Sequence, residues 1–136
     1  VLNQKIAAYE AGMINRVNAN LINQLNKEPA IQAIIHRLNS KDKNTEKQPT
    51  HDEWNAVNSV AEKDFPALCD IKANPKISPL EYQICLLTKL RFEIADIVLL
   101  TGKDNSFITA KRKRMLPKLF NCTGSAKDFD ALILGL

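Results

Sequence analysis

The side chains whose type and spacing most clearly indicate a binding function are six cations in one short stretch. They are Lys103, Lys111, Arg112, Lys113, Arg114 and Lys118. Asp104 is the only acid between residues 103 and 118, so this stretch carries a net charge of +5, whereas residues 1–102 are neutral and residues 119–136 carry −1. A cationic cluster confined to one segment indicates a polyanionic partner such as nucleic acid.

Other reactive side chains form no catalytic or metal-binding pattern. His36 and His51 lack cysteines or carboxylates at ligand spacing, so we predict no metal site. Cys69, Cys85 and Cys122 are odd in number and widely spaced, which argues against a disulfide framework and favours reduced thiols. Cys85 lies in an apolar segment and is expected to be inert. We therefore predict that the chain is not an enzyme and uses no cofactor.

Length and composition are those of one or two small helical domains. The chain has 136 residues, of which 45% are hydrophobic and 25% charged. No apolar run approaches the length of a membrane span, and we expect a cytoplasmic location for this part. Because the first residue is Val1 rather than Met, we expect a fragment of a longer protein, whose sensor or membrane anchor would lie upstream.

Residues 1–28 are predicted to form an amphipathic helix. Its apolar residues recur every three or four positions, as Leu2, Ile6, Tyr9, Met13, Val17, Leu21 and Leu25. Two interpretations stay open. The helix packs on its own domain, or it forms the coiled-coil seam of a homodimer.

Residues 29–76 are predicted to be a helical linker that packs on the domain after it. One helix is predicted to begin at Pro29. Residues 40–49 are polar, and this composition predicts a loop. Thr50 and Glu53 have the spacing of a capping box, which predicts a second helix that ends at Phe65-Pro66. Trp54 is interpreted as a core anchor, and no small-molecule site is evident.

Residues 77–136 are predicted to contain four helices. Ser78-Pro79 begins the first, and Gly102 suits a left-handed residue after the second. Asp104 is expected to cap a basic helix from Asn105 to about Leu116, because Pro117 favours a kink or an end there. The last helix starts near Ser125. In the basic helix, Ile108, Met115 and Leu119 are predicted to face the core.

This succession predicts a helix-turn-helix, in which the second helix enters the major groove of duplex DNA. The predicted base-reading residues are Asn105, Ser106, Thr109, Ala110 and Lys113. The predicted phosphate contacts are Lys103, Lys111, Arg112, Arg114 and Lys118.

The same segment resembles a known family of regulators. Leu90-Arg91-Phe92, Asp96-Ile97-Val98, Leu100, Gly102, Ile108, Lys111 to Met115, and Lys118-Leu119 are similar to the C-terminal domain of the LuxR/NarL/FixJ regulators. The run from Gly124 to Asp130, Trp54 with Phe65-Pro66, and Leu80-Glu81 with residues 84–87 resemble the ends of Bacteroides-type regulators. In those proteins a tetratricopeptide-repeat sensor precedes a LuxR-like DNA-binding domain.

The resemblance implies an all-α, LuxR-like fold that binds duplex DNA in transcription control as a homodimer. By position it assigns the base contacts to Thr109, Ala110 and Lys113. Arg91 stands where the family usually has glycine, and Pro117 where a cation is usual. These two departures keep a rival function open, namely a helical interaction or dimerisation module that has lost DNA binding.

Overall fold

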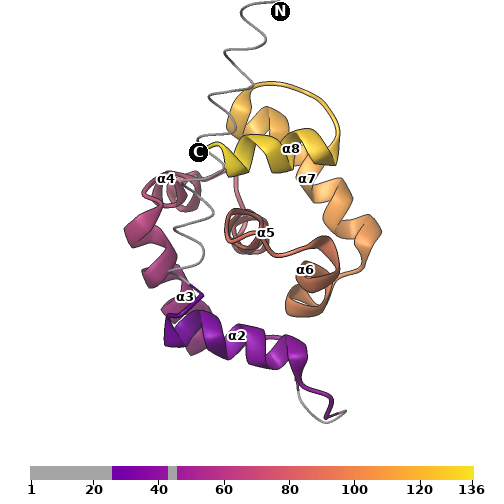
Figure 1. Ribbon diagram of the computed structural model, residues 1–136. Coiled ribbons are helices and arrows are strands. Elements are labelled where there is room, and N and C mark those ends of the chain that lie inside the picture. The colour runs from indigo at the N-terminus through magenta and orange to yellow at the C-terminus, as the bar shows by residue number, and fades with distance from the viewer. Residues whose placement is uncertain (1–25, 43–45) are drawn as a thin grey trace, which may run out of the picture.

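The computed structural model describes residues 26–42 and 46–136, and within these residues it is entirely helical, with seven helices and no strand. The all-α prediction is confirmed for this part of the chain (Figure 1). Most of the amphipathic helix predicted for residues 1–28 lies outside the described residues. The helices are α2 (Pro29–Asn39), α3 (His51–Asp64), α4 (Ala67–Ala73), α5 (Pro79–Lys89), α6 (Ile94–Thr101), α7 (Asn105–Phe120) and α8 (Ala126–Leu134).

Local capping interactions determine where several helices begin. Thr50 Oγ1 accepts a hydrogen bond from the Glu53 backbone N–H at 3.2 Å, and the Glu53 carboxylate accepts one from the Thr50 N–H at 3.1 Å. This capping box satisfies two amide groups that a helix start leaves without partners. Ser78 with Glu81 and Ser125 with Asp128 form the same arrangement. The predicted starts at Thr50, Ser78 and Ser125 are confirmed.

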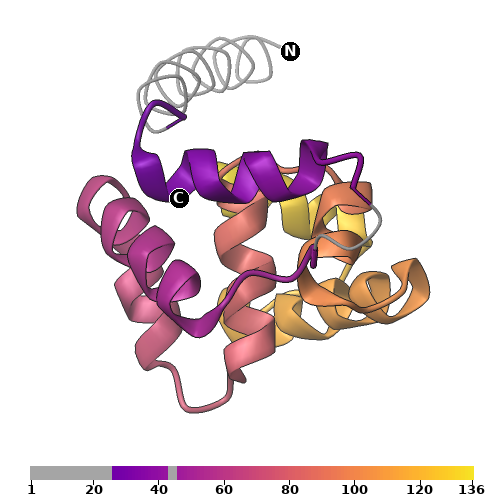
Figure 2. The ribbon, with the colours of Figure 1, turned by 90° about the horizontal axis from the view of Figure 1, so that it is seen from below.

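Helix α5 occupies the centre of the protein, and the other helices surround it (Figures 1 and 2). Eight of its 11 residues are buried, including Ile84, Leu86 and Leu87. A helix that is apolar on most of its circumference is stable only when neighbours cover it on several sides. Helices α4, α6, α7 and α8 all contact α5.

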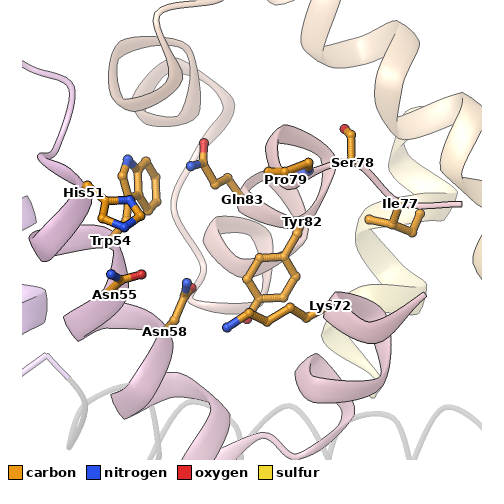
Figure 3. Close-up of a pocket in the computed structure, with 10 residues that line it drawn as sticks. All are labelled: His51, Trp54, Asn55, Asn58, Lys72, Ile77, Ser78, Pro79, Tyr82 and Gln83. Atoms are coloured by element: carbon orange, nitrogen blue, oxygen red, sulfur yellow. The ribbon is translucent and has the colours of Figure 1, made fainter. Parts of the chain in front are cut away.

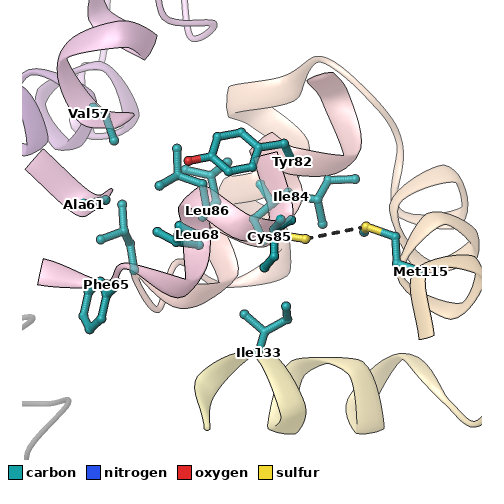
Figure 4. Packing of buried hydrophobic residues seen from close by; sticks show 14 of the residues in the cluster. Val57, Ala61, Phe65, Leu68, Tyr82, Ile84, Cys85, Leu86, Met115 and Ile133 are labelled. Carbon is teal, nitrogen blue, oxygen red and sulfur yellow. Dashed lines mark hydrogen bonds between the residues drawn. The ribbon is translucent and has the colours of Figure 1, made fainter. Parts of the chain in front are cut away.

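One continuous apolar cluster joins the predicted linker to the predicted DNA-binding segment (Figure 4). Ile34 of α2, Val57 of α3 and Leu68 of α4 belong to the same cluster as Ile84 of α5 and Ile133 of α8. The segment 29–76 therefore packs on the four helices that follow it, as predicted. None of the helices within residues 26–42 and 46–136 combines the length and the apolar character needed to cross a membrane.

Two left-handed residues shape the turns on either side of α6. Gly102 has φ 72° and ends α6, as predicted, and a Cβ atom at this position would lie 2.5 Å from Nε2 of Gln48. Arg91 has φ 66° in the turn before α6, and its backbone N–H donates to the carbonyl of Thr88 at 3.0 Å. The turn is therefore closed with arginine in the left-handed conformation that glycine adopts most easily.

Helix α7 continues past the point where its end was predicted. It passes through Pro117 to Phe120, and Asn121, with φ 53°, follows it. Proline lacks the N–H that would bond to the carbonyl four residues earlier, so a single hydrogen bond is lost at Lys113. The prediction of an end near Leu116 is wrong, because three residues with normal N–H groups continue the helix after Pro117.

Candidate nucleic-acid interface

Helices α6 and α7 form a helix, a three-residue turn and a second helix. Residues 102–104 connect them, and this length, together with the glycine, is typical of helix-turn-helix motifs. Asp104 Oδ1 accepts a hydrogen bond from the Phe107 backbone N–H at 2.7 Å, which confirms the predicted cap of α7. The start of α7 is thereby held next to the end of α6, and the two helices contact each other.

The buried face of α7 determines which of its residues are exposed. Ile108, Met115 and Leu116 are fully buried, and the Met115 sulfur lies 3.6 Å from Cys85 Sγ of α5 (Figure 4). Leu119 packs against the same core while it is partly exposed. The predicted inward face is therefore confirmed, and Leu116 is an additional member. The side chains on the opposite side of α7 face away from α5.

The five predicted base-reading residues all lie in the first nine residues of α7. Asn105, Ser106 and Lys113 are exposed, whereas Thr109 and Ala110 are half-buried. Thr109 Oγ1 donates a hydrogen bond to Asn105 Oδ1 at 3.0 Å, so these two side chains already have a partner in the isolated protein. Ser106, Ala110 and Lys113 follow each other by four and three residues, which aligns them along one face of the helix.

Four cations remain available on and beside α7. Lys103, Lys113 and Arg114 are exposed, and Lys111 is half-buried. None of the four forms an ion pair with another residue of the described part of the chain. Because Lys103, Lys113 and Arg114 are exposed, helices α2 to α4 do not cover these side chains. A polyanion therefore has access to these ammonium and guanidinium groups.

Two of the predicted phosphate contacts, Arg112 and Lys118, form ion pairs within the fold. Arg112 Nη1 lies 2.6 Å from Asp130 Oδ2 of α8, and the arginine side chain is only 11% exposed. Lys118 Nζ lies 3.1 Å from Oε2 of Glu81, whose side chain is 3% exposed. These contacts connect α7 to α8 and to α5. The other predicted phosphate contacts, Lys103, Lys111 and Arg114, form no ion pair with an acid of the described residues.

The buried carboxylate of Glu81 shows why the lysine is held there. Burial by itself would raise the pKa of Glu81, but hydrogen bonds from the Ser78 backbone N–H and from Lys118 outweigh it and lower the pKa. Glu81 is consequently ionised at neutral pH and needs a cationic partner. The ammonium group of Lys118 provides that partner for the Glu81 carboxylate.

No family assignment comes from comparison with known proteins. No protein-family model matches the chain, and no curated protein or solved structure matches it either.

Phe107 is a feature of the candidate interface that the sequence did not reveal. Its large apolar side chain is 36% exposed. The ammonium groups of Lys103 and Lys111 lie 5.4 and 5.6 Å from the centre of its ring. The spacing of Phe107 and Lys111, four residues apart on one helix, was the only signal in the sequence for this cluster.

Among the described residues, no three histidines, cysteines or acids come together in a group that could hold a metal ion. Burial raises the pKa of the Cys85 thiol to about 12, so this cysteine stays protonated and unreactive. Cys69 and Cys122 are exposed and free.

A small cavity lies between α3, the end of α4 and the start of α5 (Figure 3). It encloses about 270 Å³, and Trp54 and Tyr82 contribute aromatic surface to it. Trp54 also packs against the core, as predicted. The lining residues are His51, Trp54, Asn55, Asn58, Lys72, Ile77, Ser78, Pro79, Tyr82 and Gln83, so no residue of α6 or α7 takes part and the cavity is separate from the candidate interface.

Proposed function

We propose that this chain binds duplex DNA in a sequence-dependent manner through α6 and α7. The observation that carries the proposal is the group of exposed cations on and just before the second helix of a helix-turn-helix. Among them, Lys103, Lys113 and Arg114 form no ion pair with an acid of the described residues. In such motifs the second helix enters the major groove and the first braces it across the backbone.

Base reading is assigned to the exposed face at the start of α7. Asn105, Ser106 and Lys113 offer hydrogen-bonding groups, and Ala110 offers a methyl group between them. Lysine at Lys113 can donate to the acceptors of guanine, whereas amide and hydroxyl groups read other base edges. Lys103, Lys111 and Arg114 flank this face and contact phosphates, which position the helix without selecting sequence.

The resemblance to LuxR-type regulators supports a role as the output domain of a bacterial transcriptional regulator. In this proposal two copies bind two half-sites about one helical turn of DNA apart, as paired helix-turn-helix domains do. A homodimer would place two α7 helices on the same side of the duplex. Sedimentation of the chain with and without its DNA site measures this stoichiometry.

A binding site is first selected from a random pool of DNA duplexes. The test is then a fluorescence-anisotropy titration of the chain with that site. We expect binding whose affinity falls steeply between about 50 and 200 mM salt, because each neutralised phosphate releases counterions. A variant with Lys103, Lys111, Lys113 and Arg114 changed to alanine should lose this binding while retaining its circular-dichroism spectrum.

A charge-matched control variant distinguishes a defined DNA interface from attraction between DNA and the net positive charge of the chain. Lys27, Lys63, Lys76 and Lys127 are exposed and lie outside α6 and α7. Changing these four to alanine removes the same charge and should reduce affinity far less. Equal losses in the two variants, or no salt-sensitive binding by the unaltered chain, would contradict the proposal.

A second candidate function, a helical interaction module, is favoured by a different observation. Large apolar side chains are exposed on α6 and α8, where Leu99 is 44% and Leu132 is 40% exposed. Two of the six clustered cations are also engaged internally, which weakens the field that DNA would meet. Dimerisation in sedimentation experiments without any salt-dependent DNA binding would support this alternative.

A further inference from the structure

The aromatic ring of Phe107 lies at the leading end of the helix that is proposed to enter the groove. It occupies the first turn of α7, where its backbone N–H is bonded to the cap residue Asp104. Large apolar side chains with this much exposure are rare in the described part of the chain, which has four. Residues in the first turn of a recognition helix are those that approach base edges most closely.

Two lysines, one in the turn before α7 and one in α7 itself, make cation–π contacts with this ring. Lys103 belongs to the turn and Lys111 lies one helical turn further along α7, and their ammonium groups lie 5.4 and 5.6 Å from the ring centre. Attraction between an ammonium group and an aromatic face restrains both partners. The ring and the two charges therefore form one small surface, which we call the Phe107 cluster, that is apolar at its centre and cationic at its edges.

Duplex DNA presents a matching surface where thymine occurs. The C5-methyl of thymine is the apolar group of the major groove, and aromatic or small apolar side chains are its usual contacts. Phosphates border the groove on both sides and attract cations. A protein partner would leave the two ammonium groups without counter-charges unless it supplied acids at both edges, so DNA is the favoured occupant.

We propose that Phe107 contacts the C5-methyl of a thymine in the recognised site, while Lys103 and Lys111 bind the phosphates beside it. This inference depends on the proposed function, because it concerns how α7 selects sequence. It adds a residue to the predicted base-reading set, and it assigns a base, thymine, to a position that the resemblance does not specify.

The experiment replaces thymine by deoxyuridine, one position at a time, in the duplex selected from the random pool. This change removes the methyl group and leaves base pairing intact. We expect one position in each half-site at which affinity falls about fourfold, which corresponds to the loss of one buried methyl group. Phe107→Ala should weaken binding to the unmodified site and should abolish the further loss at that position.

Two more variants serve as controls. Phe107→Leu keeps an apolar contact and should retain part of the sensitivity to deoxyuridine. Leu132→Ala removes a similarly exposed apolar side chain from α8 and should leave the sensitivity unchanged.

Three results would overturn the inference. If duplex binding is strong but no thymine position is coupled to Phe107, this inference is wrong and the proposed function stands. If the chain prefers single-stranded DNA in a manner that depends on Phe107, the ring stacks on bases rather than contacting a methyl group. If no DNA of either form binds, both the inference and the proposed function are wrong.

Discussion

Arg112 Nη1 and Asp130 Oδ2 lie 2.6 Å apart, and their contact joins the middle of α7 to α8. The pair uses one nitrogen and one oxygen, while Arg112 Nε and Asp130 Oδ1 are buried without a hydrogen-bond partner in the described structure. A basic residue in the most cationic segment of the chain therefore serves the packing of two helices. Its neighbours Lys111, Lys113 and Arg114 carry the charge that faces outward.

Arg112→Ala is expected to reduce stability more than it reduces the electrostatic attraction for DNA. Removing the guanidinium leaves the partly buried Asp130 without its cation, which should lower the free energy of unfolding by about 1–3 kcal/mol in urea titrations. Asp130→Asn should have an effect in the same direction, whereas Lys113→Ala should stay within about 0.5 kcal/mol of the unaltered protein. If stability is unchanged, and the slope of log affinity for DNA against log salt concentration falls by the amount expected for one phosphate contact, Arg112 binds phosphate instead.

Lys113 and Lys103 are expected to differ in how they affect DNA binding. Lys113→Ala should cost about 1–3 kcal/mol on the selected site and relax preference at one base pair. Lys103→Ala should weaken all sequences alike and lower the slope of log affinity against log salt by about 0.9. Anisotropy titrations on the selected and mixed duplexes at several salt concentrations measure both effects. Identical, sequence-independent losses for the two variants would contradict the assignment of Lys113 to base reading.

Lys89 is expected to make stability rise with pH in the alkaline range. Its side chain is buried, its ammonium group donates to the carbonyls of Leu134 and Leu136, and it lies 4.8 Å from the centre of the Phe65 ring. Burial lowers its pKa to about 8 from the ordinary 10.5, with a smaller contribution from Arg91. Between these values the unfolded chain binds more protons than the folded one, so this group adds stability as pH rises from about 8 to 10.5.

The comparison with Lys89→Met isolates that contribution. The free energy of unfolding of the unaltered protein, minus that of the variant, should increase between pH 8 and 10.5 and be flat below pH 7. A difference that does not vary with pH across this range would show that Lys89 titrates as it does in the unfolded chain.

Glu53 is expected to make the protein sensitive to acid. Arg37 Nε and Nη2 donate to its carboxylate at distances from 2.5 to 3.1 Å. These bonds lower the pKa of Glu53 to about 2 from the ordinary 4.5, against the opposing effect of burial. The resulting stability is fully present above pH 4.5 and is lost as pH falls through about 2. Urea unfolding of the protein and of Glu53→Gln should give a difference that shrinks over this range.

Arg37→Gln provides the matched background for this experiment. Without the guanidinium, the pH-dependent part of the Glu53→Gln effect should largely disappear, because the hydrogen bonds that shift the pKa are gone. A pH dependence that persists in the Arg37→Gln background would assign the shift to the capping contacts with Thr50 instead.

The starts and ends of helices could be read from short stretches of sequence. Thr50 with Glu53, Ser78 with Pro79, and Asp104 each act on amide groups within three or four residues, and the structure confirms all three. Gly102 likewise marks the end of α6 through its own backbone conformation. The end of α7 was misplaced because a proline in the last turn costs only one hydrogen bond, and the residues after it continue the helix.

The roles of individual cations required the tertiary arrangement of the helices. Arg112 meets an acid 18 residues away, and Lys118 meets one 37 residues away. A spacing pattern within one helix contains no information about partners at such separations, because these depend on how α5, α7 and α8 pack. Composition and periodicity located the basic helix and its inward face, whereas packing selected which of its charges face solvent and exposed the ring of Phe107.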